Sequence, residues 1–194
     1  MEIIKNNKGQ TLLEMVFAIG ILIMVVTAIL ALSTSSIFGQ KGSESQITAN
    51  SLAREGIEVV RNIRDSNWLA GQAWDAGLVG PGSGLSSITA IPVFDHLANS
   101  WVLDFSADES TTVNIFGGVY NQQKVGVPVQ GLTTPFRRLL TLYSICQLAN
   151  GSQHQSIDCG ADKKVGIKVE AAVNWLERGQ PHQIKLESLL YDWK

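Results

Sequence analysis

The stretch that decides the fold is residues 8–32, which read KGQTLLEMVFAIGILIMVVTAILAL. Eighteen consecutive uncharged and mostly apolar residues, Met15 to Leu32, follow a short basic leader, and a single carboxylate, Glu14, stands directly before them. A helix from Gln10 to Leu32 would be roughly 34 Å long, slightly more than the hydrocarbon thickness of a bilayer. We therefore predict that this segment spans a membrane.

The charges that flank the segment predict its orientation. Lys5 and Lys8 lie on its short N-terminal side, and the next charged residue beyond it is Lys41. The tendency of basic residues to stay on the cytoplasmic side places residues 1–9 in the cytoplasm and exports everything after about Ser33.

Three interpretations of the segment compete. A cleaved secretory signal would explain the small residues around Ala31-Leu32-Ser33, but the apolar core of such a signal usually has only about 7 to 15 residues. A plain signal anchor would tether an exported domain and would leave Glu14 without a role. A carboxylate at the edge of a bilayer is costly unless it is paired, so it indicates a functional site with an unnamed partner.

The third interpretation is a resemblance. The run from Lys8-Gly9-Gln10 to Glu14, followed at once by the apolar residues, resembles the class III signal of type IV pilins and type II secretion pseudopilins. The resemblance implies that a membrane aspartic peptidase cuts between Gly9 and Gln10 and then methylates the new amino group of Gln10. This chain has Gln10 where the family most often has phenylalanine.

The resemblance also implies a role for Glu14 and a set of partners. In fibres of this family the acid meets the N-terminal amine of an adjacent subunit, which fixes the axial stagger between subunits. Removing one member of such a pair would leave a charge unpaired, at a cost of about 3 to 5 kcal/mol. The implied partners are other pilin subunits, the prepilin peptidase and methyltransferase, an inner-membrane assembly platform with a cytosolic ATPase, and the lipid bilayer before assembly.

Residues 33–69 are predicted to continue the helix in amphipathic form. Ser33 to Ser36, Gly39 and Gly42 favour helix poorly, so a bend or a local loss of helix is expected there. Beyond Glu44 the apolar residues recur at helical intervals and the charged residues occupy other faces. The apolar set is Ile47, Leu52, Ile57, Val60, Ile63 and Trp68, and the charged set is Arg54, Glu55, Glu58, Arg61, Arg64 and Asp65. Residues 52–62 also resemble the corresponding segment of minor pilins of the pilus-modification branch.

The rest of the chain predicts an antiparallel sheet, and hence an α+β fold with the amphipathic half of the helix packed on it. Residues 70–135 are rich in glycine, serine, asparagine and proline and should form a variable region with short strands at 88–94, 101–105 and 112–116. Residues 136–194 should form the main sheet. Its expected strands are 137–146, 165–175 and 184–190, with a turn at 177–181.

The two cysteines, Cys146 and Cys159, bracket a polar loop on the exported side, and we predict a disulfide between them. The alternative is a pair of free, half-buried thiols. No metal site is expected, because the cysteine spacing matches no zinc pattern and the nearby His154 suits a solvent-exposed loop.

The remaining motifs give no strong indication of a function. Asp104, Asp108 and Glu109 lack the regular spacing of a calcium loop. The basic pairs 137–138 and 163–164 sit in a chain of net charge -2, which gives no strong nucleic-acid signal. The tryptophans are expected in the core and at interfaces, not as a sugar platform. A short glycosylation pattern at 150–152 is discounted. With no catalytic motif present, we expect no enzyme activity and no cofactor.

The resemblance and these patterns together predict a prepilin, favoured as a minor pilin over a major subunit. It would be a single-pass protein of the inner membrane with a cytoplasmic N-terminus, and later part of an extracellular or periplasmic fibre. A secretion pseudopilin remains an alternative, as does a monomeric signal-anchored domain that binds an extracellular ligand through residues 70–135.

Overall fold

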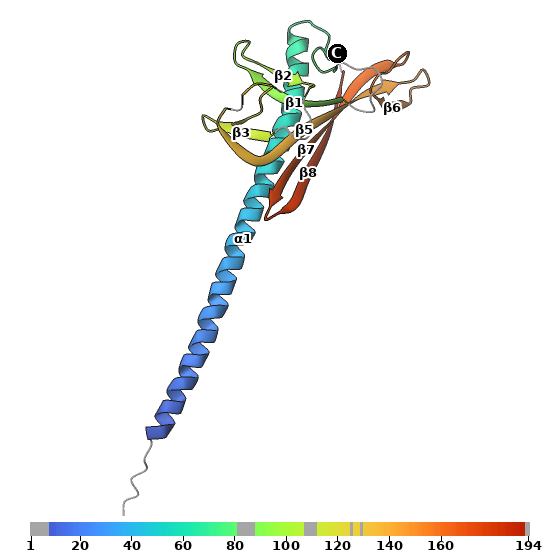
Figure 1. Cartoon of the computed structure of the whole chain (residues 1–194). Helices are drawn as coiled ribbons and strands as arrows, with labels where there is room; N and C mark the ends of the chain where they lie inside the picture. Colours follow the sequence, from blue (N-terminus) through green and yellow to red (C-terminus); the bar gives the residue numbers. More distant parts are fainter. Residues whose placement is uncertain (1–7, 81–87, 107–111, 125, 129, 193–194) are drawn as a thin grey trace, which may run out of the picture. The chain divides into compact units, whose positions relative to one another are not determined.

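The computed structural model describes residues 8–80, 88–106, 112–124, 126–128 and 130–192 (Figure 1). The chain divides into two compact units, Met1–Ser45 and Gln46–Lys194. The described residues form one long helix, α1, followed by eight strands, β1 to β8. The fold is α+β, as predicted.

Helix α1 runs from Lys8 to Leu69. It continues without interruption through residues 33–42, which contradicts the expected local loss of helix. The hydroxyl of Ser43 donates to the Gly39 carbonyl at 3.0 Å, and that of Thr34 donates to the Leu30 carbonyl, one helical turn earlier in each case. Hydroxyls that bond back in this way no longer compete with the helix for its backbone groups.

The first unit contains the apolar part of α1. Every side chain from Thr11 to Ile19 and from Ile21 to Lys41 is exposed within the chain. Among the described residues, α1 is the one helix long and apolar enough to cross a membrane, and its most apolar stretch has no residue buried inside the protein. This stretch therefore needs an apolar environment that the described chain does not supply.

In the second unit, the end of α1 packs on the sheet. Leu52, Val60 and Ile63 are buried as predicted, and so is Ala49. Ile47 is 68% exposed, however, so the buried stripe begins two residues later than its pattern suggested.

Gly56 explains how the helix approaches the sheet so closely. A Cβ atom at this position would lie 2.8 Å from Cδ2 of Leu140 on the sheet. A glycine in the middle of a helix costs about 0.5 to 1 kcal/mol relative to alanine. At Gly56 the absence of a side chain allows the helix to pack closely on the sheet, and this contact accompanies the cost of the glycine.

The sheet is antiparallel and is organised around β5. On one side β5 pairs with β1, β3 and β6, and along the other side it pairs with β7, which in turn pairs with β8. Strands β2 and β4 pair with β1 and β3. The bounds are β1 Ile88–Asp95, β2 Ser100–Asp104, β3 Thr112–Phe116, β4 Val119–Asn121, β5 Leu132–Gln147, β6 Gln153–Ser156, β7 Lys163–Glu177 and β8 Gln180–Tyr191.

The alternation in β7 is confirmed from Ile167 to Trp175, whereas Val165, predicted in the same buried row, is only half-buried. Its residues Ile167, Val169, Ala171, Val173 and Trp175 are all buried in the core under the helix. The hairpin to β8 closes through Arg178 and Gly179, both at positive φ (51° and 76°). Two such residues form the turn whose twist matches an antiparallel hairpin.

An arginine on the sheet joins the helix to β5. Arg138 is 1% exposed, and its guanidinium pairs with Glu55 of α1 at 3.3 Å. It also donates to the Leu52 carbonyl at 3.0 Å and to Gln122 Oε1 at 2.9 Å. Burial lowers the pKa of Arg138, and the neighbouring carboxylate of Glu55 opposes that shift.

A second cluster of charged side chains lies on the outer face of β7 and β8 and consists of Lys168, Glu170, Lys185 and Glu187. Glu170 and Glu187 lie directly opposite each other, an arrangement that is unfavourable for two like charges. Lys168 binds Glu187 at 3.0 Å, and Lys185 binds Glu170. The hydrogen bond from Lys168 lowers the pKa of Glu187, and the hydrogen bond to Glu170 raises the pKa of Lys185.

Glu55→Ala should destabilise the domain by about 3 kcal/mol, because it leaves the buried Arg138 charge without its carboxylate. Urea unfolding of the full chain in detergent, followed by tryptophan fluorescence, measures this. The matched control is Glu58→Ala, which removes an exposed helix pair and should cost no more than about 0.5 kcal/mol. Equal effects of the two substitutions would show that the buried pair contributes no more to the free energy of unfolding than the exposed pair.

Glu187→Gln should make the stability of the folded chain less dependent on pH in the acidic range. The pKa of Glu187 is lowered in the folded chain, so its contribution is complete above the ordinary value of 4.5 and is lost as the pH falls through the lower folded value. Melting temperatures across this range should therefore converge for the two proteins at low pH. Glu177→Gln is the control, and a similar convergence in that variant would contradict the assignment to Glu187.

Candidate functional site

The predicted processing site lies at the beginning of α1. Because the helix begins at Lys8, the backbones of Gly9 and Gln10 are in its first turn in the intact chain. Glu14 follows Gln10 by four residues, about one helical turn, and its side chain is exposed. The structure therefore brings the predicted cleavage position and the acid to neighbouring turns of one helix.

The helix surface that follows Glu14 is almost entirely apolar, whereas the turn before it carries Gln10 and Thr11. Residues such as Leu13, Phe17, Ile21 and Leu32 are each at least 60% exposed. Between Met15 and Leu32 the hydroxyl of Thr27 bonds within the helix and donates to the Met24 carbonyl at 2.9 Å. Such a surface suits a bilayer or a bundle of similar helices, where side chains must satisfy their polar groups internally.

The predicted disulfide is present and links the end of β5 to the loop between β6 and β7. Cys146 and Cys159 are bonded, with their Cα atoms 5.4 Å apart. Cys146 is fully buried at the end of β5. The Ser144 hydroxyl donates to the Ile157 carbonyl at 3.0 Å, so a hydrogen bond holds the same loop beside the covalent link.

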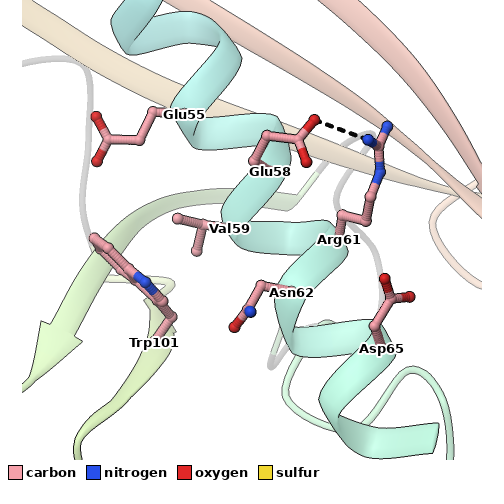
Figure 2. Close-up of a pocket in the computed structure, with 7 residues that line it drawn as sticks. All are labelled: Glu55, Glu58, Val59, Arg61, Asn62, Asp65 and Trp101. Atoms are coloured by element: carbon pink, nitrogen blue, oxygen red, sulfur yellow. Dashed lines mark hydrogen bonds and ion pairs between the residues drawn. The ribbon is translucent and has the colours of Figure 1, made fainter.

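A groove of about 380 Å³ lies along the second half of α1. Figure 2 shows its walls: helix residues including Glu55, Val59 and Asn62 on one side and the indole of Trp101, from β2, on the other. Glu58 lies farther round the helix and binds Arg61 at 2.8 Å. The groove thus combines carboxylates, an amide and an aromatic ring.

The other sequence candidates are not brought together. The described part of the chain contains no group of three or more metal-ligating side chains. Asp104 accepts hydrogen bonds from Ser106 two residues on, while Asp108 and Glu109 lie outside the described residues. His154 faces Asp162 at 3.8 Å, whereas His182 stacks on Trp175.

The basic pairs do not form a common basic surface. Arg138 is buried beneath the helix, and Lys164 binds Asp75 at 2.8 Å. Arg64, expected on a polar face of the helix, is in fact 8% exposed and donates to the Tyr191 carbonyl. Arg64 and Arg138 are therefore buried in the domain, where they bond to other residues of the chain.

Sequence reasoning missed the groove and the buried pair for different reasons. Arg138 falls between Phe136 and Leu140 in the inward phase of β5, so the strand period did contain a signal for its burial. Trp101 and Glu55 are far apart in the chain, and no local pattern connects them.

Comparison with protein-family models, with curated proteins and with solved structures finds no match to this chain.

Replacing both cysteines, Cys146→Ser with Cys159→Ser, should lower the free energy of unfolding by about 3 kcal/mol, because the closed loop restricts the unfolded chain. Urea unfolding gives the value. Reduction of the wild-type protein should shift the midpoint by the same amount. An unchanged midpoint after complete reduction would contradict a stabilising role.

Proposed function

We propose that this chain is a prepilin, cut between Gly9 and Gln10 and built into a type IV pilus or pseudopilus through its N-terminal helix. The supporting observation is one juxtaposition: Glu14 stands directly before an apolar helical surface that no described part of the chain covers. An uncovered apolar surface of this length favours either lipid or other helices as its surroundings.

Glu14 distinguishes assembly from simple anchoring. An anchor needs only apolar length, and an acid at its edge adds a desolvation cost. In a fibre the same acid would be matched by the free amine that cleavage creates on Gln10 of a neighbouring copy. Methylation of that amine, the modification implied by the resemblance, would keep its positive charge.

The proposed partners follow from this chemistry. A peptidase and methyltransferase must act at Gly9 and Gln10, and the bilayer must hold the chain until it is used. Extraction from the bilayer requires work, which an assembly platform with a cytosolic ATPase would supply. The chain would first be a single-pass protein of the cytoplasmic membrane with its N-terminus inside, and then a fibre subunit outside.

Within this class we favour a minor pilin. The support is the resemblance of residues 52–62 to minor pilins of the pilus-modification branch. In the structure this segment buries Leu52, Ala53 and Val60 against the sheet, so it is the part of the helix that holds the exported domain. A secretion pseudopilin would use the same helix and the same acid.

The experiment is a paired measurement of processing and of incorporation. Mass spectrometry of the mature wild-type protein should find an N-terminus at Gln10. Glu14→Ala should retain membrane insertion and cleavage but be depleted at least tenfold from sheared surface filaments, because the pairing with the neighbouring amine is lost.

The matched control is Glu44→Ala, which removes an exposed acid from the same helix beyond its apolar part. It should incorporate normally. Recovery of an intact leader on functional protein, a mature start at Thr34, or undiminished incorporation of the Glu14 variant would each exclude the proposal.

A further inference from the structure

The groove beside Trp101 has a rigid aromatic wall. Trp101 pairs with Phe94 across the β1–β2 hairpin, and their rings meet edge to face at 5.2 Å. Trp101 is half-buried, because part of it packs on the core while the rest lines the groove. The ring is thus held in one orientation before any ligand arrives, which reduces the entropy lost on binding.

The carboxylates of the groove are already balanced in charge. Glu55 is paired with Arg138 at 3.3 Å, Glu58 with Arg61 at 2.8 Å, and Asp65 with Arg64 at 2.9 Å. Each pair engages one carboxylate oxygen, and the second oxygen makes no hydrogen bond to a residue that the structure describes. The groove therefore offers acceptors without a large negative field.

Asn62 adds the complementary groups. Its side chain is exposed on the groove, and its amide can donate as well as accept. Trp101 supplies the apolar wall of the groove, the nearly buried Val59 adds a small apolar area, and the Asn62 amide lies beside them. The volume of about 380 Å³ falls within the range of small-molecule sites.

We propose that this groove binds a neutral saccharide, in contrast to the expectation from the sequence that the tryptophans do not form a sugar platform. A pyranose ring presents an apolar C–H face, which suits the ring of Trp101, and equatorial hydroxyls, which suit the second carboxylate oxygen of Glu55 and the Asn62 amide. Hydroxyls can donate to the carboxylates without disturbing their arginine partners. A saccharide of one or two rings matches the groups that face Trp101, which are Glu55, Val59 and Asn62, whereas Glu58 and Asp65 point to the other side of the helix (Figure 2).

A cationic ligand fits the same residues less well. An ammonium or guanidinium group would compete with Arg61, Arg64 and Arg138 for carboxylates that are already neutralised. Its attraction would also fall as salt is added, whereas a neutral ligand is insensitive to salt. Salt dependence therefore separates the two classes.

The test uses the full chain in a zwitterionic detergent, because sugar-based detergents would themselves compete. Saturation-transfer NMR with maltose, cellobiose and lactose at millimolar concentration should detect binding of at least one of them, with the same affinity at low and high salt. Spermidine is the cationic probe and should not compete.

Trp101→Leu should weaken binding by about tenfold, because it removes the stacking surface but keeps an apolar side chain on the core. Trp74→Leu, which removes another half-buried tryptophan outside the groove, is the matched control and should bind normally. Asn62→Ala, an exposed helix substitution, gives a second variant if the Trp101 variant fails to fold, and it too should weaken binding.

Three results would overturn the proposal: no transfer to any of the three disaccharides, equal binding by wild type and the Trp101 and Asn62 variants, or displacement by spermidine with salt-dependent affinity. None of them bears on processing at Gly9 or on the incorporation that depends on Glu14. The saccharide site and the fibre function therefore fail or survive independently.

Discussion

An apolar helical surface that the described chain leaves uncovered is the constraint from which the rest of the molecule follows. From Leu12 to Leu32 nearly every side chain of α1 is exposed, and the helix is long and apolar enough there to cross a membrane, so this surface suits lipid or other helices. Glu14 lies at its beginning, where a carboxylate that enters lipid is costly unless it is paired. In the proposed fibre, helices of other copies would cover this surface and a neighbouring amine would pair with Glu14.

The same helix changes its role at the boundary between the two units. After Gln46 it becomes part of a compact domain, where Gly56 admits close contact with the sheet and Arg138 bonds to Glu55 and to the Leu52 carbonyl. A buried ion pair adds little net stability compared with apolar packing, but it is costly to misalign. We interpret the pair as a device that selects one register of the helix on the sheet.

Much of the architecture was predictable because it rests on local periodicity. Strand β3 has the predicted bounds, and the inward row of β7 is the predicted one. Strands β4 and β6 were not predicted: β4 has three residues and β6 reads QHQS, so neither shows an alternation of apolar and polar residues. They become strands because a longer neighbour offers unpaired backbone groups, and burial rewards that pairing.

Three features could be predicted from the sequence alone, because each depends on residue type at a short spacing. They are the membrane-length helix, the buried row of β7 and the disulfide between Cys146 and Cys159. The burial of Arg64 and the meeting of Trp101 with Glu55 could not be predicted in this way. These depend on which surfaces meet when the helix settles on the sheet, and the free energy of that contact is spread over many residues distant in the chain. Local pattern therefore decided the elements, whereas the packing of one element on another decided which polar groups are buried and where a groove opens.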